Sequence, residues 1–490
     1  MSAGGRWNDR VRTMVHGPRS VALQLSKTGG PPFNGSVGYV NDRIGPILSA
    51  HGWDVRAFAP APPAVPSAQE SMVPLAFAQA RLRQERRGRA DLAIHDGAGV
   101  SVRTPARQWA ERHLVLYHGL AYGPGAWLGN DAVDLHVANS PYLARSLRAV
   151  CGLPDWARRT VLDPDGFVRI TDIAMPVPCV AAPDGDPGFS LGADLPDAVQ
   201  RAADAGVILG HALQPGKQDL MATVAVLFWL NDALRRVGRR VMLVIAEESL
   251  PPPHRATIDG MLAGTGLTCD ALFIPVPLLR QRAVFEVFRV CRFGLAYNVF
   301  PEPFGFYVLE SVFAGCPVYT NGAGNNRFLL PPGHGIEVIE TDAMAPDAAG
   351  NSDPSAFRCV ADAIVRDLDA DAAVRDACTR GRARIGATWS LAAFESGLLG
   401  AIDRALAPAP AAPVFDALRI DYSPLVRGID RSTQRMRSDY GHQILAPEAL
   451  ALVDAIVGRT PDRLDAVERQ AVERFGLFER GVLALNPDPA

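Results

Sequence analysis

Short apolar runs alternate with amphipathic stretches through the first 340 residues, and this alternation limits the fold more than any other feature of the sequence. It is the pattern of parallel strands covered by helices. The runs form two successive sets: 21–25, 55–58, 92–95, 114–117 and 135–138, then 207–209, 241–246, 271–274, 293–297 and 318–320. The sequence therefore predicts two α/β domains, one after the other.

Two segments of unusual composition mark the predicted boundaries of these domains. A chain of 490 residues is too long for one ordinary core. A Pro/Gly/Asp-rich segment at 182–196 separates the two sets of strands, and an Ala/Pro tract follows the helical periodicity of 355–406. We expect domains at 1–190 and 197–406, a linker at 407–413 and a small, mainly helical accessory unit at 414–490. Its two helix-like stretches are 447–457 and 461–474.

The bulk composition excludes several classes of partner. Hydrophobic residues make up 48%, charged residues 21%, and the formal net charge is −3, so nothing favours nucleic acid or an anionic membrane surface. The first residues lack the apolar core of a signal peptide, and the longest apolar run, 221–230, is half a bilayer span. Seven cysteines occur without a CxxC pair. These features predict a cytoplasmic protein with no integral membrane segment, zinc site or disulfide framework.

Lysine is almost absent from the chain. Of 49 basic residues only Lys27 and Lys217 are lysine, and both occur in glycine-containing loops. A compact ammonium on a flexible stem can act as a point charge for phosphate. The pattern favours a phosphate contact for Lys217 and leaves Lys27 open.

The segment 298–326 carries the strongest chemical signal. Pro303 blocks a helix until Gly305, residues 306–314 then form a predicted helix, and Gly315 and Pro317 end it. A helix that begins after the carboxyl end of a strand presents free N–H groups to an anion such as a diphosphate. Glu302 precedes this helix and Glu310 lies within it among apolar residues, so both carboxylates can accept hydrogen bonds from sugar or ribose hydroxyls. The alternative is that both glutamates are solvated charges that the helix dipole favours and that bind no ligand.

This segment resembles the Glu-x7-Glu motif of retaining GT-B glycosyltransferases of the family 4 type. The resemblance covers roughly residues 17–400, and Glu302, Pro303, Phe304, Gly305 and Glu310 match in register. It implies a GT-B fold, in which two Rossmann-like domains face a cleft. It also implies that Glu302 contacts sugar hydroxyls, that Gly305 and Phe306 bind the diphosphate, and that Glu310 holds the ribose.

A second segment, 207–220, resembles the loop of that family that carries an arginine and a lysine for the diphosphate. Lys217 and Asp219 fit this loop. His211 stands in the place of the arginine and would contact the phosphate; a histidine that caps the end of the strand is the alternative.

Two further loops complete the predicted site. Residues 26–40 resemble the first glycine-rich loop of the family, where Gly29 and Gly30 let the backbone approach the donor. His118 follows a strand end, where the family often has a histidine that faces the donor sugar. In the loop 321–326 the family often ends a glycine-rich turn in an acid, whereas this chain has Asn325 and Asn326.

No motif indicates a divalent cation. Four DxD pairs begin at 163, 184, 367 and 369, in a turn, in the linker and on a solvated helix, and none follows a strand end. We therefore predict a metal-independent reaction without a cofactor, in which Glu302, His118 and Lys217 serve catalysis.

Taken together, the residues and the resemblance predict a glycosyltransferase. Its donor would be a UDP- or GDP-sugar, and its acceptor, a small molecule, a glycan or a peptide, stays open, as does the oligomeric state. A sugar-nucleotide epimerase or phosphorylase on the same fold and a non-catalytic scaffold protein are the alternatives. Residues 414–490 loosely resemble small winged-helix peptide-recognition domains, with a lid or an oligomerisation element as the other options.

Overall fold

The computed structural model describes residues 19–25, 36–58, 89–96, 110–119, 132–151, 170–180, 195–279, 281–341, 354–407, 419–439, 441–478 and 480–486. The chain forms two compact units, and it crosses between them several times. The first unit contains Met1–Ile173, Phe394–Ser423 and Ile456–Ala490, and the second contains Ala174–Ala393 and Pro424–Ala455. Because the second unit takes residues from both sides of 394–423, neither unit is one continuous stretch of sequence.

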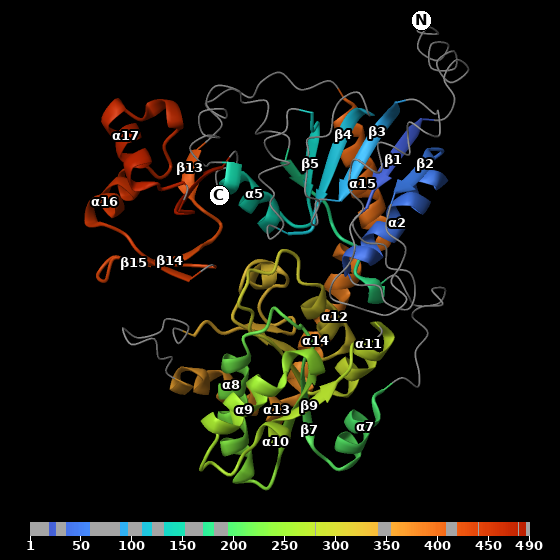
Figure 1. The fold of residues 1–490 in the computed structure, drawn as a ribbon, viewed down its shortest axis with the longest axis vertical. Helices are drawn as coiled ribbons and strands as arrows, with labels where there is room; N and C mark the ends of the chain where they lie inside the picture. Colours follow the sequence, from blue (N-terminus) through green and yellow to red (C-terminus); the bar gives the residue numbers. More distant parts are fainter. Residues whose placement is uncertain are drawn as a thin grey trace, which may run out of the picture. The chain divides into compact units, whose positions relative to one another are not determined.

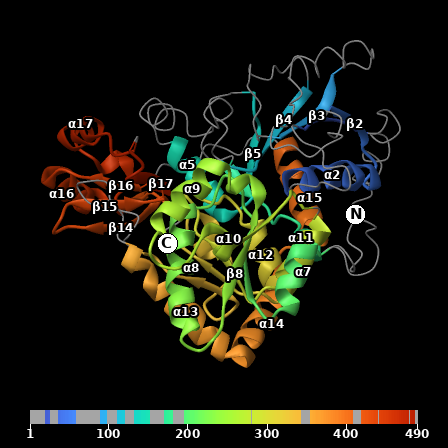
Figure 2. The ribbon, with the colours of Figure 1, turned by 60° about the horizontal axis from the view of Figure 1, so that its bottom comes forward.

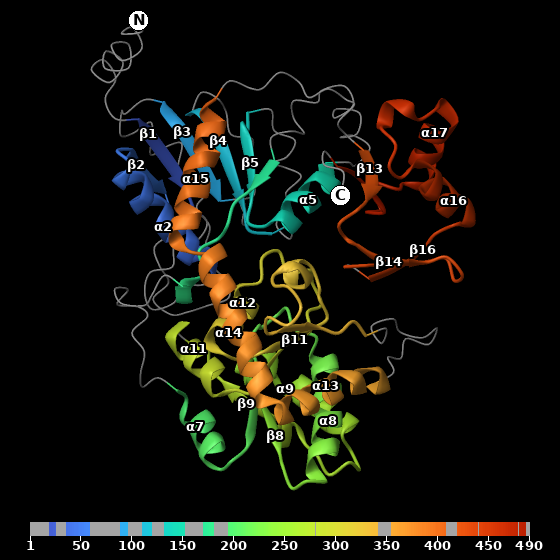
Figure 3. The same ribbon diagram turned by 180° about the vertical axis from the view of Figure 1, so that it is seen from behind.

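The first unit is built on a six-stranded parallel sheet with the strand order β2-β1-β3-β4-β5-β6. Its strands are β1 (Ser20–Gln24), β2 (Asp54–Phe58), β3 (Ala90–Asp96), β4 (Ala110–Tyr117), β5 (Leu135–Ala138) and β6 (Ile170–Asp172). Helices α2 (Ser36–Ala50), α5 (Pro141–Cys151) and α15 (Leu391–Leu406) pack around it (Figure 1). Figure 3 shows α15 lying along one face of this sheet, where Gly397 approaches Ile173.

The second unit has its own six-stranded parallel sheet, with the order β12-β11-β10-β7-β8-β9. Its strands are β7 (Ile208–Ala212), β8 (Val241–Ala246), β9 (Phe273–Val276), β10 (Phe293–Ala296), β11 (Val318–Thr320) and β12 (Ile336–Val338). The chain adds β8 and β9 on one side of β7 and then β10 to β12 on the other. The order therefore reverses between β7 and β10.

Helices cover both faces of this second sheet (Figure 2). They are α7 (Asp197–Asp204), α8 (Leu220–Arg235), α9 (Pro252–Met261), α10 (Cys269–Leu272), α11 (Gln281–Val290), α12 (Phe306–Ala314), α13 (Arg358–Asp369) and α14 (Asp371–Thr388). Successive residues of one strand enter different cores: Leu243 joins the core with α8 and α13, and Val244 joins the core with α7 and α11. This two-sided burial explains the continuous apolar runs in the sequence.

The sequence predicted most of these strands. All ten expected runs overlap strands β1–β5 and β7–β11, and the helix expected at 306–314 is α12. Strands β6 and β12 were not predicted, because only one residue of each is buried and neither forms an apolar run. Most of the expected linker at 182–196 lies outside the described residues, so its role as a boundary stays a prediction.

The C-terminal part differs from its expected form. Helices α16 (Pro447–Ile456) and α17 (Ala466–Phe475) match the two expected helical stretches, but five strands accompany them. Strands β13 (Arg419–Tyr422) and β17 (Leu483–Asn486) form an antiparallel pair, and β14 (Val426–Asp430), β15 (Arg435–Ser438) and β16 (Gly441–Ile444) form a three-stranded antiparallel sheet. The region is thus mixed α/β rather than mainly helical. Its residues 424–455 group with the second unit and the rest with the first.

One helical stretch, Asp371–Leu406, is long and apolar enough to cross a membrane by length and composition, although only 28% of its most apolar window is buried. This stretch is not one continuous helix. Helix α14 ends at Thr388 and α15 begins at Leu391, and the two residues between them are not helical. A core helix of a soluble protein meets the same length and composition. The expected cytoplasmic location stays a prediction.

Candidate functional site

The reversal of strand order in the second unit places two loops side by side at the carboxyl edge of the sheet. The loop after β7 and the loop after β10 are joined by backbone hydrogen bonds, from Asp219 N to the Tyr297 oxygen (2.6 Å) and from Val299 N to the Lys217 oxygen (2.8 Å). In open parallel sheets, ligands bind at such a switch point. The strand order alone therefore identifies these two loops as a candidate ligand-binding site.

An ion pair joins the side chains of these two loops. Lys217 Nζ lies 2.9 Å from Glu302 Oε2, so the two side chains are in direct contact. The Glu302 side chain is 6% exposed, whereas that of Lys217 is 48% exposed. The carboxylate is thus held in place, and the ammonium keeps access to a ligand.

Helix α12 begins immediately after this pair, at a glycine that no other residue could replace without strain. Gly305 has φ +108°, and a Cβ there would meet Leu329 Cδ1 at 2.7 Å and Asn326 Oδ1 at 2.9 Å. Glycine has no side chain to cap the helix, so the first N–H groups of α12 keep their capacity to bind an anion. Pro303 is half-buried before this turn, and the ring of Phe304 packs on Phe306 with centroids 4.4 Å apart.

A third loop, residues 321–327 after β11, holds the backbone on both sides of Glu302. Glu302 N donates to the Ala323 oxygen (3.3 Å), and Asn325 N donates to the Glu302 oxygen (2.7 Å). Between them Gly324 has φ +66°, and a Cβ there would lie 2.3 Å from Glu302 N. Only glycine permits this approach, so the position of Glu302 depends on loop 321–327.

Glu310 lies inside α12 in a different environment. Its side chain is buried, and Gln281 at the start of α11 donates a hydrogen bond to Glu310 Oε1. Burial raises the pKa of Glu310 to about 8, and the hydrogen bond from Gln281 opposes this shift. The side chain therefore holds a proton at neutral pH unless a ligand favours the ionised form. Gln281 is a contact that sequence reasoning missed, because 29 residues separate it from Glu310.

His211 does not join this group of residues, which corrects the predicted phosphate contact. It is fully buried, with Nδ1 2.6 Å from the Tyr307 hydroxyl and Nε2 2.9 Å from Ser311 Oγ. Burial lowers the pKa of His211 to about 3, so the ring is neutral. Both ring nitrogens contact side chains of α12, so His211 packs this helix on β7. The role of His211 is therefore structural, as the alternative to phosphate binding proposed.

Two asparagine side chains are buried at the same edge of the sheet. Within the described part of the chain, neither amide atom of Asn298 or of Asn326 has a hydrogen-bond partner, although the residues are only 2% and 1% exposed. Buried amides are nearly always satisfied by protein, water or ligand. Asn298, which follows β10, is a candidate that sequence reasoning missed; its signal was a polar residue directly after a buried strand.

The remaining predicted site residues belong to the first unit. His118 is buried after β4, with Nε2 3.7 Å from Asp96 Oδ1, and Asp96 also accepts a hydrogen bond from Asn41 Nδ2 at 2.7 Å. Gly29 and Gly30 lie outside the described residues. The contributions of His118 and of this glycine-rich loop to catalysis or donor binding stay predictions.

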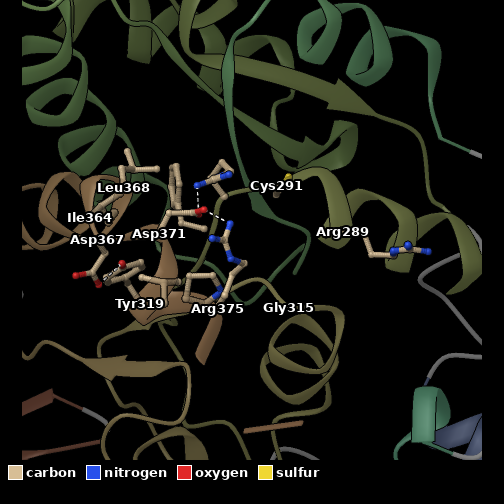
Figure 4. A pocket seen from close by; sticks show the side chains of 13 residues that line it. Arg289, Cys291, Gly315, Tyr319, Ile364, Asp367, Leu368, Asp371 and Arg375 are labelled. Carbon is tan, nitrogen blue, oxygen red and sulfur yellow. Dashed lines mark hydrogen bonds and ion pairs between the residues drawn. The ribbon is translucent and has the colours of Figure 1, made fainter. Parts of the chain in front are cut away.

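A small cavity lies at the opposite, amino end of the second sheet (Figure 4). Its volume is about 180 Å³, and Phe293 and Pro317 at the beginnings of β10 and β11 line it. Its charges are paired within the protein, since Arg292 and Arg375 both donate to Asp371. Among the described residues, no three His, Cys, Asp or Glu side chains form a group that could hold a metal ion.

Comparisons with known proteins find similarity in solved structures alone. No family model matches the chain, and no curated protein sequence matches it. A glycosyltransferase from Rickettsia africae ESF-5 is similar with a TM-score of 0.51 and 11% identity, over 79% of this chain and 99% of that chain. An α,α-trehalose-phosphate synthase (UDP-forming) from Burkholderia vietnamiensis also has a TM-score of 0.51, with 13% identity over 81% and 99%. The chain has the GT-B fold, with one Rossmann-like sheet in each unit.

Proposed function

We propose that this protein is a glycosyltransferase that moves a sugar from a nucleoside diphosphate to an acceptor, with retention of configuration and without a metal ion. The observation that carries the proposal is the ion pair between Lys217 and Glu302, placed at the switch point of the second sheet directly before the N-terminus of α12. The GT-B fold adds support, because both of its structural relatives above are named as sugar-transferring enzymes.

Each part of this site suits one part of a nucleotide sugar. The N-terminus of α12 and the half-exposed ammonium of Lys217 suit the diphosphate. The enclosed carboxylate of Glu302 suits sugar hydroxyls, since an ionised carboxylate accepts two or more hydrogen bonds. Glu310, eight residues further along, suits the ribose hydroxyls. Asn298 and Asn326 supply further amide groups at the same edge.

Charge on the departing diphosphate explains how the reaction can proceed without a metal. As the bond from the anomeric carbon to the phosphate oxygen breaks, negative charge develops on the diphosphate. Lys217 and the α12 dipole are fixed donors aimed at that charge, and such preorganised groups stabilise a transition state by several kcal/mol. Glu302 places a negative charge near the positive charge that develops on the sugar. The acceptor would attack from the face that the diphosphate leaves.

The proposal is tested by melting the protein with nucleotide sugars in EDTA. Because the name of the Burkholderia relative describes a UDP-forming synthase, a UDP-sugar is the first donor to try. The series begins with UDP-glucose, followed by GDP-mannose and ADP-glucose. A donor at about a hundred times its Kd should stabilise the protein by about 2.7 kcal/mol. If none of the donors raises the Tm of the wild-type protein, the proposed donor site is wrong.

Product analysis separates transfer from the alternatives. A transferase, given a donor without an acceptor, should slowly hydrolyse it to the free sugar with the original anomeric configuration, which NMR detects. An epimerase would return an isomerised sugar, a phosphorylase would require phosphate, and a scaffold protein would leave the donor intact.

A further inference from the structure

The three-stranded sheet β14–β16 holds the loop that fixes Glu302, although it lies outside the part of the chain that resembles glycosyltransferases. Arg427 on β14 donates a hydrogen bond to the backbone oxygen of Asn321, at the start of loop 321–327. At the end of the loop, Arg327 Nη2 donates to the Pro424 oxygen at 2.8 Å. Asp439, between β15 and β16, reaches the middle of the loop, where its Oδ1 accepts from Gly324 N at 3.3 Å.

These contacts are made by buried charges. The Asp439 side chain is 0% exposed, and its Oδ1 lies 2.6 Å from Arg327 Nη1, whose side chain is 14% exposed. Arg427, 9% exposed, lies 3.7 Å from the same oxygen and pairs with Glu340 at 3.2 Å. Removing one member of a buried pair leaves an uncompensated charge, which is strongly unfavourable. The network therefore constrains loop 321–327 far more than surface ion pairs would.

The loop transmits this constraint to Glu302 through backbone contacts. Gly324 and Glu302 form a parallel β-bridge, in which Glu302 donates a backbone hydrogen bond to Ala323 and accepts one from Asn325. The approach is so close that a shift of Gly324 requires a shift of Glu302. A displacement of 1 Å in a positioning group can lower a rate by about a hundredfold.

We propose that Asp439 is a positioning residue of the sugar-binding site, and that the β14–β16 sheet sets the place of Glu302 by holding Gly324 and Arg327. This inference rests on the proposed function for the role of Glu302, and it replaces the expectation that residues 414–490 form a separate accessory unit. Asp439 acts through the backbone of loop 321–327 and does not itself touch the donor.

The first test measures the loop without any ligand. Asp439→Asn keeps the size and one oxygen of the side chain but removes the charge that holds Arg327. The matched control is Asp454→Asn, which removes an exposed ion pair with Arg431 beside the same sheet. Hydrogen exchange of the peptides that cover 302–305 and 321–327 should become at least tenfold faster in Asp439→Asn and stay unchanged in Asp454→Asn. Equal exchange in both variants and the wild-type protein would overturn the proposal.

The second test compares the affinity of the protein for two ligands, UDP-glucose and UDP. Because Glu302 is assigned to the sugar, Asp439→Asn should weaken binding of UDP-glucose by about tenfold, the usual size of such indirect effects, while UDP binds nearly as before. A purely structural role would weaken both ligands equally, and that result would contradict the proposal. If Asp439→Asn does not fold, Arg427→Lys takes its place, since lysine keeps the charge but loses the forked donor that reaches Asn321.

The two tests also separate the two proposals. If the wild-type protein binds neither UDP-glucose nor another nucleotide sugar, the proposed function fails, and the exchange experiment still decides whether Asp439 holds the loop. If the wild-type protein binds a donor and Asp439→Asn changes neither exchange nor affinity, only the positioning role fails.

Discussion

The two glutamates of the candidate site lie eight residues apart and occupy opposite kinds of environment. Glu302 is in a loop, paired with the ammonium of Lys217 and fixed by backbone contacts with loop 321–327. Glu310 is inside a helix, buried among apolar side chains, and its pKa is raised to about 8. The carboxylate that we assign to the reacting sugar is paired with a cation, whereas the carboxyl group that we assign to binding alone is neutral until a ligand favours its ionised form. The comparison predicts different defects for the two residues.

The largest effect is expected from Glu302→Gln. Loss of the carboxylate charge near the developing positive charge of the sugar should lower kcat about a hundredfold, or about 2.7 kcal/mol, with a smaller change in donor affinity. Steady-state kinetics measure this, with Glu337→Gln as the control, since Glu337 pairs with Arg366 at the surface of the same unit. If Glu302→Gln kept a kcat near that of the wild-type protein, the carboxylate charge of Glu302 would have no role in the reaction.

Glu310→Gln should mainly raise the KM for the donor. The proposed contacts of Glu310 with ribose would be the same in the ground state and the transition state, so their loss should weaken binding by about 1.5 to 3 kcal/mol with little change in kcat. A fall in kcat as large as that of Glu302→Gln would show that the two glutamates do not have separate roles.

The pH dependence of stability should differ between wild-type protein and Glu310→Gln. The pKa of Glu310 is raised, so the folded state keeps a proton that the unfolded chain releases, and the proton's contribution to stability is lost as pH rises from about 4.5 to about 8. Glutamine has no such proton. The Tm of Glu310→Gln should therefore rise relative to that of the wild-type protein between pH 5 and pH 8, and a constant difference would contradict the raised pKa.

The smallest effect is expected from chelation. In the proposed mechanism, Lys217 and the N-terminus of α12 neutralise the diphosphate charge that a divalent cation would otherwise neutralise. EDTA should therefore leave the transfer rate unchanged. Complete loss of activity in EDTA, restored by manganese, would overturn the metal-independent mechanism.

The sequence predicted the parts of the site that local patterns encode. Pro303 and Gly305 define the start of α12 because each restricts the backbone at its own position. His211 could not be assigned in this way, since its partners Tyr307 and Ser311 follow about 100 residues later. The contact between Arg327 and Asp439 spans 112 residues, and no pattern around either residue indicates it. Long-range pairing of buried polar groups is the information that the sequence alone did not supply.

The return of the chain to the second unit at 424–455 has a consequence for biosynthesis. A ribosome makes about 5–20 residues per second, so the 115 residues between Gly324 and Asp439 take on the order of ten seconds to synthesise. For most of that interval, once Val338 has been added, β7 to β12 are complete while loop 321–327 still lacks the contacts of the β14–β16 sheet. The nascent chain thus completes the strands of the second sheet first. It reaches the final geometry around Glu302 only after Asp439 has left the ribosome.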